Sequence, residues 1–255
     1  MTLAEIREAD APLETAAIYG RLREAYGLPL VNLIWRHFAA LPGVLPWAWE
    51  TVAPAMPMLP AATQRVAAAL EPLPRLAMAD DAAALATLYN RGNLSNLILL
   101  TALLRGKLGD AQAPAAPPPA MLPEPPPLPR LDALPEPVAR AVRALAAMHG
   151  HEGGVVPTLY LHLAHWPALL PPLYASLSPL MATGRIQTLR DTALAAASIE
   201  ADALRPYLAA PVEPSAEALV AARAALRSFT SRVIPEMVVI GSMLSPTSVI
   251  DSILS

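Results

Sequence analysis

The sequence contains no cysteine in 255 residues, which excludes disulfides, thiolate catalysis and cysteine-ligated zinc or iron–sulfur clusters. Aromatic residues make up only 5%, and no segment shows the sustained alternation of a half-buried strand, which argues against an all-β fold. Lys107 is the only lysine, and the formal net charge is −3. A basic surface for nucleic acid is therefore not expected.

Charge is also scarce over long stretches, which raises the question of a membrane span. The longest uncharged stretch lies between Glu152 and Arg185 and exceeds the ~20 residues that a transmembrane helix requires. Prolines interrupt it repeatedly, and lipid offers no donors or acceptors to replace the lost backbone hydrogen bonds. We therefore expect short buried helices and no membrane partner. The first 14 residues carry several charges, unlike a signal peptide, so a cytoplasmic protein is expected.

Alanine and leucine dominate the composition, and apolar residues recur at helical spacing through most of the chain. This pattern predicts an all-α fold. Segment 111–136 is instead so rich in proline that neither a helix nor a strand is compatible with it, which predicts an extended linker. The expected organisation is an N-terminal helical repeat at 1–110, the linker at 111–136 and a C-terminal helical repeat at 137–255.

The two arms that flank the linker share a sequence pattern. A shift of 125 residues aligns identical residues, including several prolines, in the segments that begin at Leu28 and Gly153. The aligned pairs are His37 with His162, Ala39 with Ala164, Pro42 with Pro167, Pro46 with Pro171, Pro54 with Pro179 and Met56 with Met181. We interpret the halves as two similar multi-helix repeats packed as a pseudo-dimer, with a groove for a small ligand between them.

Glycine and asparagine residues mark expected ends of the predicted helices. Gly27 suits a left-handed helix C-cap after a helix that ends at Tyr26. Helices are expected at 79–91 and 94–108, and Asn93 has two interpretations between them: an N-cap next to Gly92, or a ligand-binding amide. The glycine-rich segment 149–154 is interpreted as a surface turn rather than an anion-binding loop.

Three segments resemble the group I 2-haloacid dehalogenases, and the resemblance covers most of the chain. The segments are LPGVLPWAW at 41–49, LYNRGNLSNLILLTALL at 88–104, and the stretch 148–170 that contains MHGHEGG and LAHWPALL. The resemblance implies an all-helical fold of two similar halves joined by an extended linker. It also implies hydrolysis of 2-haloacids by direct displacement, in which an aspartate activates the attacking water.

This sequence departs from the family at the aspartate. In the register set by Trp166-Pro167, the resemblance places the aspartate position at Leu159 and the preceding serine at Thr158. No aspartate occurs between Asp132 and Asp191, so the water-activating base of the family is missing.

The other pocket positions are partly retained. The resemblance assigns substrate-binding roles to the positions of Leu30, Leu33, Asn93 and Asn96. Asn93 keeps the family asparagine, Asn96 stands where the family has tyrosine, and the two leucines replace aromatic residues. A further family tyrosine falls near Thr230, and its neighbouring arginine and acid correspond to Arg232 and Glu236. Thr158 and Tyr160 supply hydroxyl groups that can bind a ligand but are poor bases at neutral pH.

Glu236 and His162 are the candidate catalytic bases that remain. Glu236 lies in an otherwise apolar helix, where burial would raise its pKa and suit it to general-base work, unless it forms an ion pair with Arg232 one turn earlier. His162 and His165 share a helical face at metal-ligand spacing, but no third ligand is evident in the sequence, and a structural histidine is the alternative.

The leading hypothesis is therefore a 2-haloacid dehalogenase-like protein that binds a small carboxylic acid between its halves and lacks the family's hydrolytic base. If the protein is an enzyme, a hydrolase of the dehalogenase type or a divergent relative is expected. The alternatives are an enzyme that uses Glu236 or His162 as base, and a non-catalytic binding protein. No cofactor and no metal are expected, and a homodimer is compatible with this reading.

Overall fold

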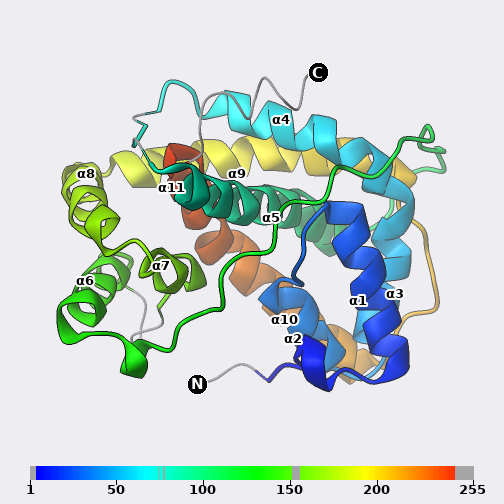
Figure 1. The fold of residues 1–255 in the computed structure, drawn as a ribbon. Helices are drawn as coiled ribbons and strands as arrows, with labels where there is room; N and C mark the ends of the chain where they lie inside the picture. Colours follow the sequence, from blue (N-terminus) through cyan, green and yellow to red (C-terminus); the bar gives the residue numbers. More distant parts are fainter. Residues whose placement is uncertain (1–3, 74, 77, 151–155, 245–255) are drawn as a thin grey trace.

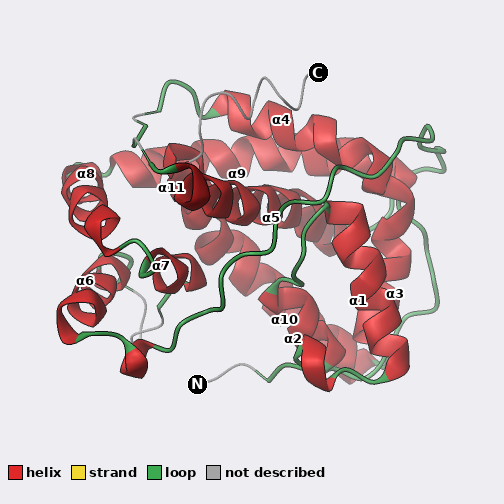
Figure 2. Ribbon diagram, in the orientation of Figure 1, coloured by secondary structure: helices red, strands yellow, loops and turns green. Residues whose placement is uncertain are grey.

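The computed structural model describes residues 4–73, 75–76, 78–150 and 156–244. Over these residues every regular element is a helix, and none is a strand (Figure 2). The prediction of an all-α fold is confirmed. None of the described helices is both long enough and apolar enough to cross a membrane.

Helices lie on both sides of the linker. Before it come α1 (Leu13–Tyr26), α2 (Leu33–Ala39), α3 (Val44–Val52), α4 (Leu59–Ala69) and α5 (Asp80–Arg105). After it come α6 (Glu136–Ala147), α7 (Thr158–Leu163), α8 (Leu170–Ala182), α9 (Arg185–Leu204), α10 (Ala216–Ser228) and α11 (Ile234–Leu244). A π-helical turn at Phe229–Val233 joins α10 to α11 without a break in the helix.

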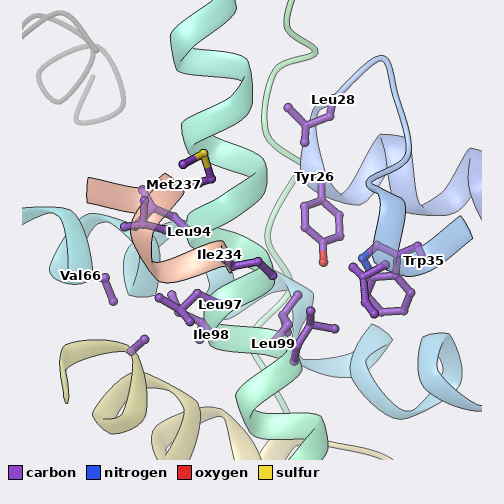
Figure 3. Packing of buried hydrophobic residues seen from close by; sticks show 14 of the residues in the cluster. Tyr26, Leu28, Trp35, Val66, Leu94, Leu97, Ile98, Leu99, Ile234 and Met237 are labelled. Carbon is purple, nitrogen blue, oxygen red and sulfur yellow. The ribbon is translucent and has the colours of Figure 1, made fainter. Parts of the chain in front are cut away.

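Helix α5 forms the centre of the molecule (Figure 1). It packs against α4 from its own arm and against α9 and α11 from the other arm. The run Leu97–Leu100 is completely buried, so this part of α5 is apolar on all sides, as expected of a helix surrounded by other helices. Figure 3 shows Leu97 and Ile98 of this run on the side of Val66, and Leu99 on the side of Trp35. One hydrophobic core therefore joins residues from before and after the linker.

Helix α5 is also continuous where the sequence suggested a break. It runs through Gly92 and Asn93, so Asn93 is not an N-cap, and that interpretation is wrong. A Cβ on Gly92 would come within 3.0 Å of the Asn32 side chain. The glycine thus permits close packing of α5 against the residue before α2 instead of ending the helix.

The proline-rich segment runs across α5 as an extended chain (Figure 1). It connects the end of α5 to the short 3-10 turn at Leu131–Ala133 that precedes α6. The extended conformation agrees with what the prolines require. The internal repeat and the division into two arms stay predictions.

Candidate functional site

Asn93 lies between two polar contacts on one face of α5. Tyr89, Asn93 and Asn96 follow each other at helical spacing and share this face. Tyr89 contacts α7 at one end of the face, and Asn96 contacts α1 and α2 at the other. The face thus borders helices from both arms.

At one end of this face, the Asn96 side chain forms hydrogen bonds to α1 and α2. Its Oδ1 accepts hydrogen bonds from the Tyr26 hydroxyl and the Trp35 Nε1, both at 2.9 Å. All three side chains are buried, and Figure 3 shows Tyr26 next to Trp35. Two donors occupy both lone pairs of the amide oxygen. Asn96 therefore holds α5 to α1 and α2 through its oxygen.

At the other end of this face, His162 of α7 contacts Tyr89 and the linker. Its Nε2 lies 3.0 Å from the Pro126 carbonyl, and its Nδ1 lies 2.6 Å from the Tyr89 hydroxyl. A carbonyl only accepts, so Nε2 carries the proton and Nδ1 accepts from Tyr89. Burial lowers the pKa of His162, and the hydrogen bond to Pro126 opposes that shift. Both ring nitrogens thus serve to join α7, α5 and the linker.

Asn93, between these two ends, is only half-buried. No described residue forms a hydrogen bond with its amide. Because an amide both donates and accepts, it can orient a carboxylate or a water molecule in this position.

Helix α7 carries the three predicted residues 158–160 in its first turn. Thr158 is exposed, whereas Leu159 is 2% exposed and belongs to the hydrophobic core. The position that the resemblance assigns to the water-activating aspartate thus holds a packed aliphatic side chain, which cannot accept a proton.

Tyr160 takes part in a buried chain of polar groups. Its hydroxyl lies 2.8 Å from His149 Nε2, and His149 Nδ1 lies 3.0 Å from Glu236 Oε2. Because a carboxylate oxygen accepts, His149 Nδ1 donates to Glu236, while Nε2 faces the Tyr160 hydroxyl, a group that can both donate and accept. Burial, and then the charge of Glu236, raises the pKa of Tyr160 above its usual range.

Glu236 is buried in the first turn of α11, as expected from the apolar sequence around it. Its Oε1 lies 3.6 Å from Arg190 Nη1 on α9, so the carboxylate contacts both a cation and an imidazole. The predicted ion pair with Arg232 involves a side chain that lies outside the described part of the chain.

His149 and Arg190 are the site residues that sequence reasoning missed. His149 is 3% exposed, so its assignment to a surface turn is wrong, while residues 151–155 of that segment lie outside the described residues. A signal for its burial was present, because His149 continues the apolar spacing of Val142 and Leu145 at the end of α6.

Solved structures with the same arrangement of helices include three of D-2-haloacid dehalogenase, each 17% identical to this chain and aligned over 95% of it. One is a mutant in complex with D-2-CPA, with a TM-score of 0.73 over 96% of that chain. Another is a mutant with a TM-score of 0.75 over 94%. The third is a complex with L-LA, with a TM-score of 0.72 over 96%. This chain has the D-2-haloacid dehalogenase fold.

No protein-family model and no curated protein sequence matches the chain. At 17% identity the structural likeness establishes the dehalogenase fold and leaves the activity to be argued from the residues.

The remaining predicted residues lie at the edges of this dehalogenase fold or in its core. Leu33, the first residue of α2, is 38% exposed, and Leu30 is half-buried against the core. Thr230 is buried in the π-helical turn, where its hydroxyl donates to the Leu226 carbonyl. Neither leucine provides the aromatic surface that the resemblance implies at these positions.

Proposed function

We propose that this protein is a divergent member of the 2-haloacid dehalogenase family that binds a small organic acid beside Asn93, between α5, α2 and α7. In this proposal the protein does not carry out the family's aspartate-dependent hydrolysis. The observation that carries it is Leu159, a buried aliphatic side chain at the position of the water-activating base, in a chain with the dehalogenase fold over 95% of its length.

The binding part of the proposal is supported by the half-buried amide of Asn93. A small acid needs a few well-placed polar groups and an otherwise apolar surface. Asn93 supplies a polar group, and Leu30 and Leu33 are the apolar residues that the resemblance places nearby. Asn96 is 1% exposed and is held in place by Tyr26 and Trp35, whereas Asn93 is half-buried, which makes Asn93 the more accessible donor for the ligand carboxylate.

A second candidate is a divergent enzyme that uses the chain formed by Tyr160, His149 and Glu236. A hydroxyl hydrogen-bonded to an imidazole, which in turn contacts a carboxylate, is an arrangement that can transfer a proton. Tyr160 also directly follows Leu159. His162 is less suited as a base, because the linker and Tyr89 engage both of its nitrogens.

The first test measures halide release from D- and L-2-chloropropionate by ion chromatography. We expect no release at ordinary enzyme rates, since loss of a general base lowers rates by roughly 10²–10⁴-fold. Rapid release would overturn the proposal and favour the second candidate. In that case Glu236→Gln should abolish the activity if the buried chain provides the base.

The second test measures binding of 2-chloropropionate by isothermal titration calorimetry. Asn93→Ala should weaken binding by about tenfold, because a hydrogen bond to a charged carboxylate is lost. Gln112→Ala, in the exposed linker, serves as the control and should leave the affinity unchanged. Equal affinities of the Asn93→Ala variant and the unmodified protein would rule out Asn93 as the binding residue.

A further inference from the structure

A second candidate site lies on a different side of α5, under the proline-rich linker. A partly open cavity of about 720 Å³ is lined mainly by α4, α5 and linker residues 116–120. Its wall contains small and apolar side chains, among them Leu59, Ala67 and Leu94. Asn93 does not line this cavity, so the cavity is separate from the ligand position proposed above beside Asn93.

Three charged residues line this cavity, Arg91, Arg75 and Glu71, and Arg91 is the one without an ionic partner among the described residues. Its Nη1 donates to the carbonyl oxygens of Ala120, at 2.8 Å, and Gly27, at 3.3 Å. These bonds fix the guanidinium between the linker and the end of α1. The Nε–Nη2 edge makes no hydrogen bond to any described residue, and this edge has the fork geometry that binds a carboxylate.

Arg91 also has no acidic partner within the described residues, and burial lowers its pKa. Arg91 is half-buried, and a guanidinium that is partly removed from water without a counter-ion is destabilised, so an anion bound beside it would relieve that cost. Arg75, which also lines the cavity, differs because it is paired with Glu71 and donates to the Ser242 carbonyl at 2.6 Å. Arg91 is therefore the better contact for an anionic ligand.

The walls of the cavity indicate what is attached to the anion. Its volume lies in the range of sites that bind drug-sized molecules and exceeds what a 2-haloacid would fill. The buried Ser95 adds a hydroxyl to the wall, and no described residue forms a hydrogen bond with that hydroxyl. The remaining wall is mainly apolar, which suits a hydrocarbon tail.

We propose that this cavity binds a monocarboxylate with an apolar tail, whose carboxylate pairs with the Nε–Nη2 edge of Arg91 and whose tail packs between α4 and the linker. The linker would then serve both as a connection between the arms and as one wall of a binding site. This proposal does not depend on the binding of a small acid beside Asn93.

The test is calorimetric titration of the full-length protein with octanoate. We expect binding that weakens at least tenfold in Arg91→Gln, because both the charge and the bidentate hydrogen bonds are lost. Arg223→Gln changes an exposed arginine on α10 and should bind octanoate normally. Octanol, which has the same tail without a charge, should bind far more weakly than octanoate.

Arg91 also holds the linker, so a second variant keeps the test decisive if Arg91→Gln fails to fold. Ala67→Leu fills part of the cavity from α4, leaves Arg91 intact and should also weaken octanoate binding. Asn93→Ala should not. Absence of octanoate binding, equal binding in the Ala67→Leu variant, or loss of binding in Asn93→Ala would each overturn the proposal.

Discussion

Gly20 and Gly241 both lie within helices but have different surroundings. A Cβ on Gly20, in α1, would meet no atom within 4 Å, whereas a Cβ on Gly241, in α11, would lie 2.9 Å from Asn90 Oδ1 and 3.1 Å from Asn90 Cβ. Gly241 thus lets α11 approach α5 closely, at the contact between the two arms. Asn90 Cβ is fixed to the α5 backbone and cannot easily move away.

This difference predicts opposite effects of alanine. Gly20→Ala should raise the free energy of unfolding by about 0.5–1 kcal/mol, because alanine is the better helix former. Gly241→Ala should lower it by about 1–3 kcal/mol, because overpacking outweighs that gain. Urea denaturation of both variants provides the measurement. Equal stabilisation by both substitutions would show that α5 and α11 are not closely packed at Gly241.

The linker has few backbone donors, one of which is the Leu122 N–H that bonds to the Gly27 carbonyl, but it keeps all its backbone acceptors. Proline removes the backbone N–H and leaves the carbonyl, so a proline-rich strand needs donors from elsewhere. Side chains provide them along its length: Arg91 donates to Ala120, His162 to Pro126 and His165 to Pro127. The extended segment is therefore fixed by side chains of α5, of α7 and of the turn that follows α7.

One of these contacts predicts a pH dependence. The pKa of His162 is lowered by burial, so the folded state binds fewer protons than the unfolded state between that lowered pKa and ~6.5. The contribution of neutral His162 to the free energy of unfolding is fully present above pH ~6.5 and is lost as the pH falls through the lowered pKa. Protonation would also remove the acceptor of the Tyr89 hydroxyl.

We therefore expect the free energy of unfolding to fall between pH 7.5 and pH 5.5, by at most ~1.4 kcal/mol per pH unit from one proton. His162→Gln should reduce this slope. His165→Gln, which changes an exposed histidine with a similar contact to the linker, is the control and should retain it. Urea unfolding at several pH values measures the slope, and an unchanged slope in His162→Gln would contradict the argument.

At the scale of the whole molecule, the two arms share one core. Helices α4 and α5 bury their apolar faces against α9 and α11, so neither arm covers its own hydrophobic surface. The proposed repeat has a parallel in two histidines. His37 in α2 contacts the Ala4 carbonyl through Nδ1 at 2.7 Å, whereas His162 in α7 contacts the Pro126 carbonyl through Nε2 at 3.0 Å; in both cases the carbonyl belongs to non-helical chain.

The shared core predicts how a single arm behaves. Residues 1–110 expressed alone should aggregate or form a homodimer, because the surface of α5 that packs on α9 and α11 is then exposed. Size-exclusion chromatography with light scattering distinguishes the states. A soluble, folded monomer of this fragment would contradict the pseudo-dimer hypothesis.

The sequence by itself determined the helical class, the extended linker and the C-cap at Gly27, whose φ is 60°. These features depend on helix propensity, on proline and on a glycine conformation, all of which act within a few residues. The sequence also indicated that Glu236 is buried, since its apolar neighbours surround it on the helix.

Only the tertiary structure decided which groups meet. The sequence around Gly92 predicts a helix break, but in the structure Asn32 packs against this glycine within a continuous helix. The sequence around His149 predicts a surface turn, but in the structure His149 is buried and hydrogen-bonds to Glu236, 87 residues away. Arg91 likewise meets the linker only because the chain crosses α5. Contacts between distant segments depend on how whole helices pack, and local spacing carries no record of that packing.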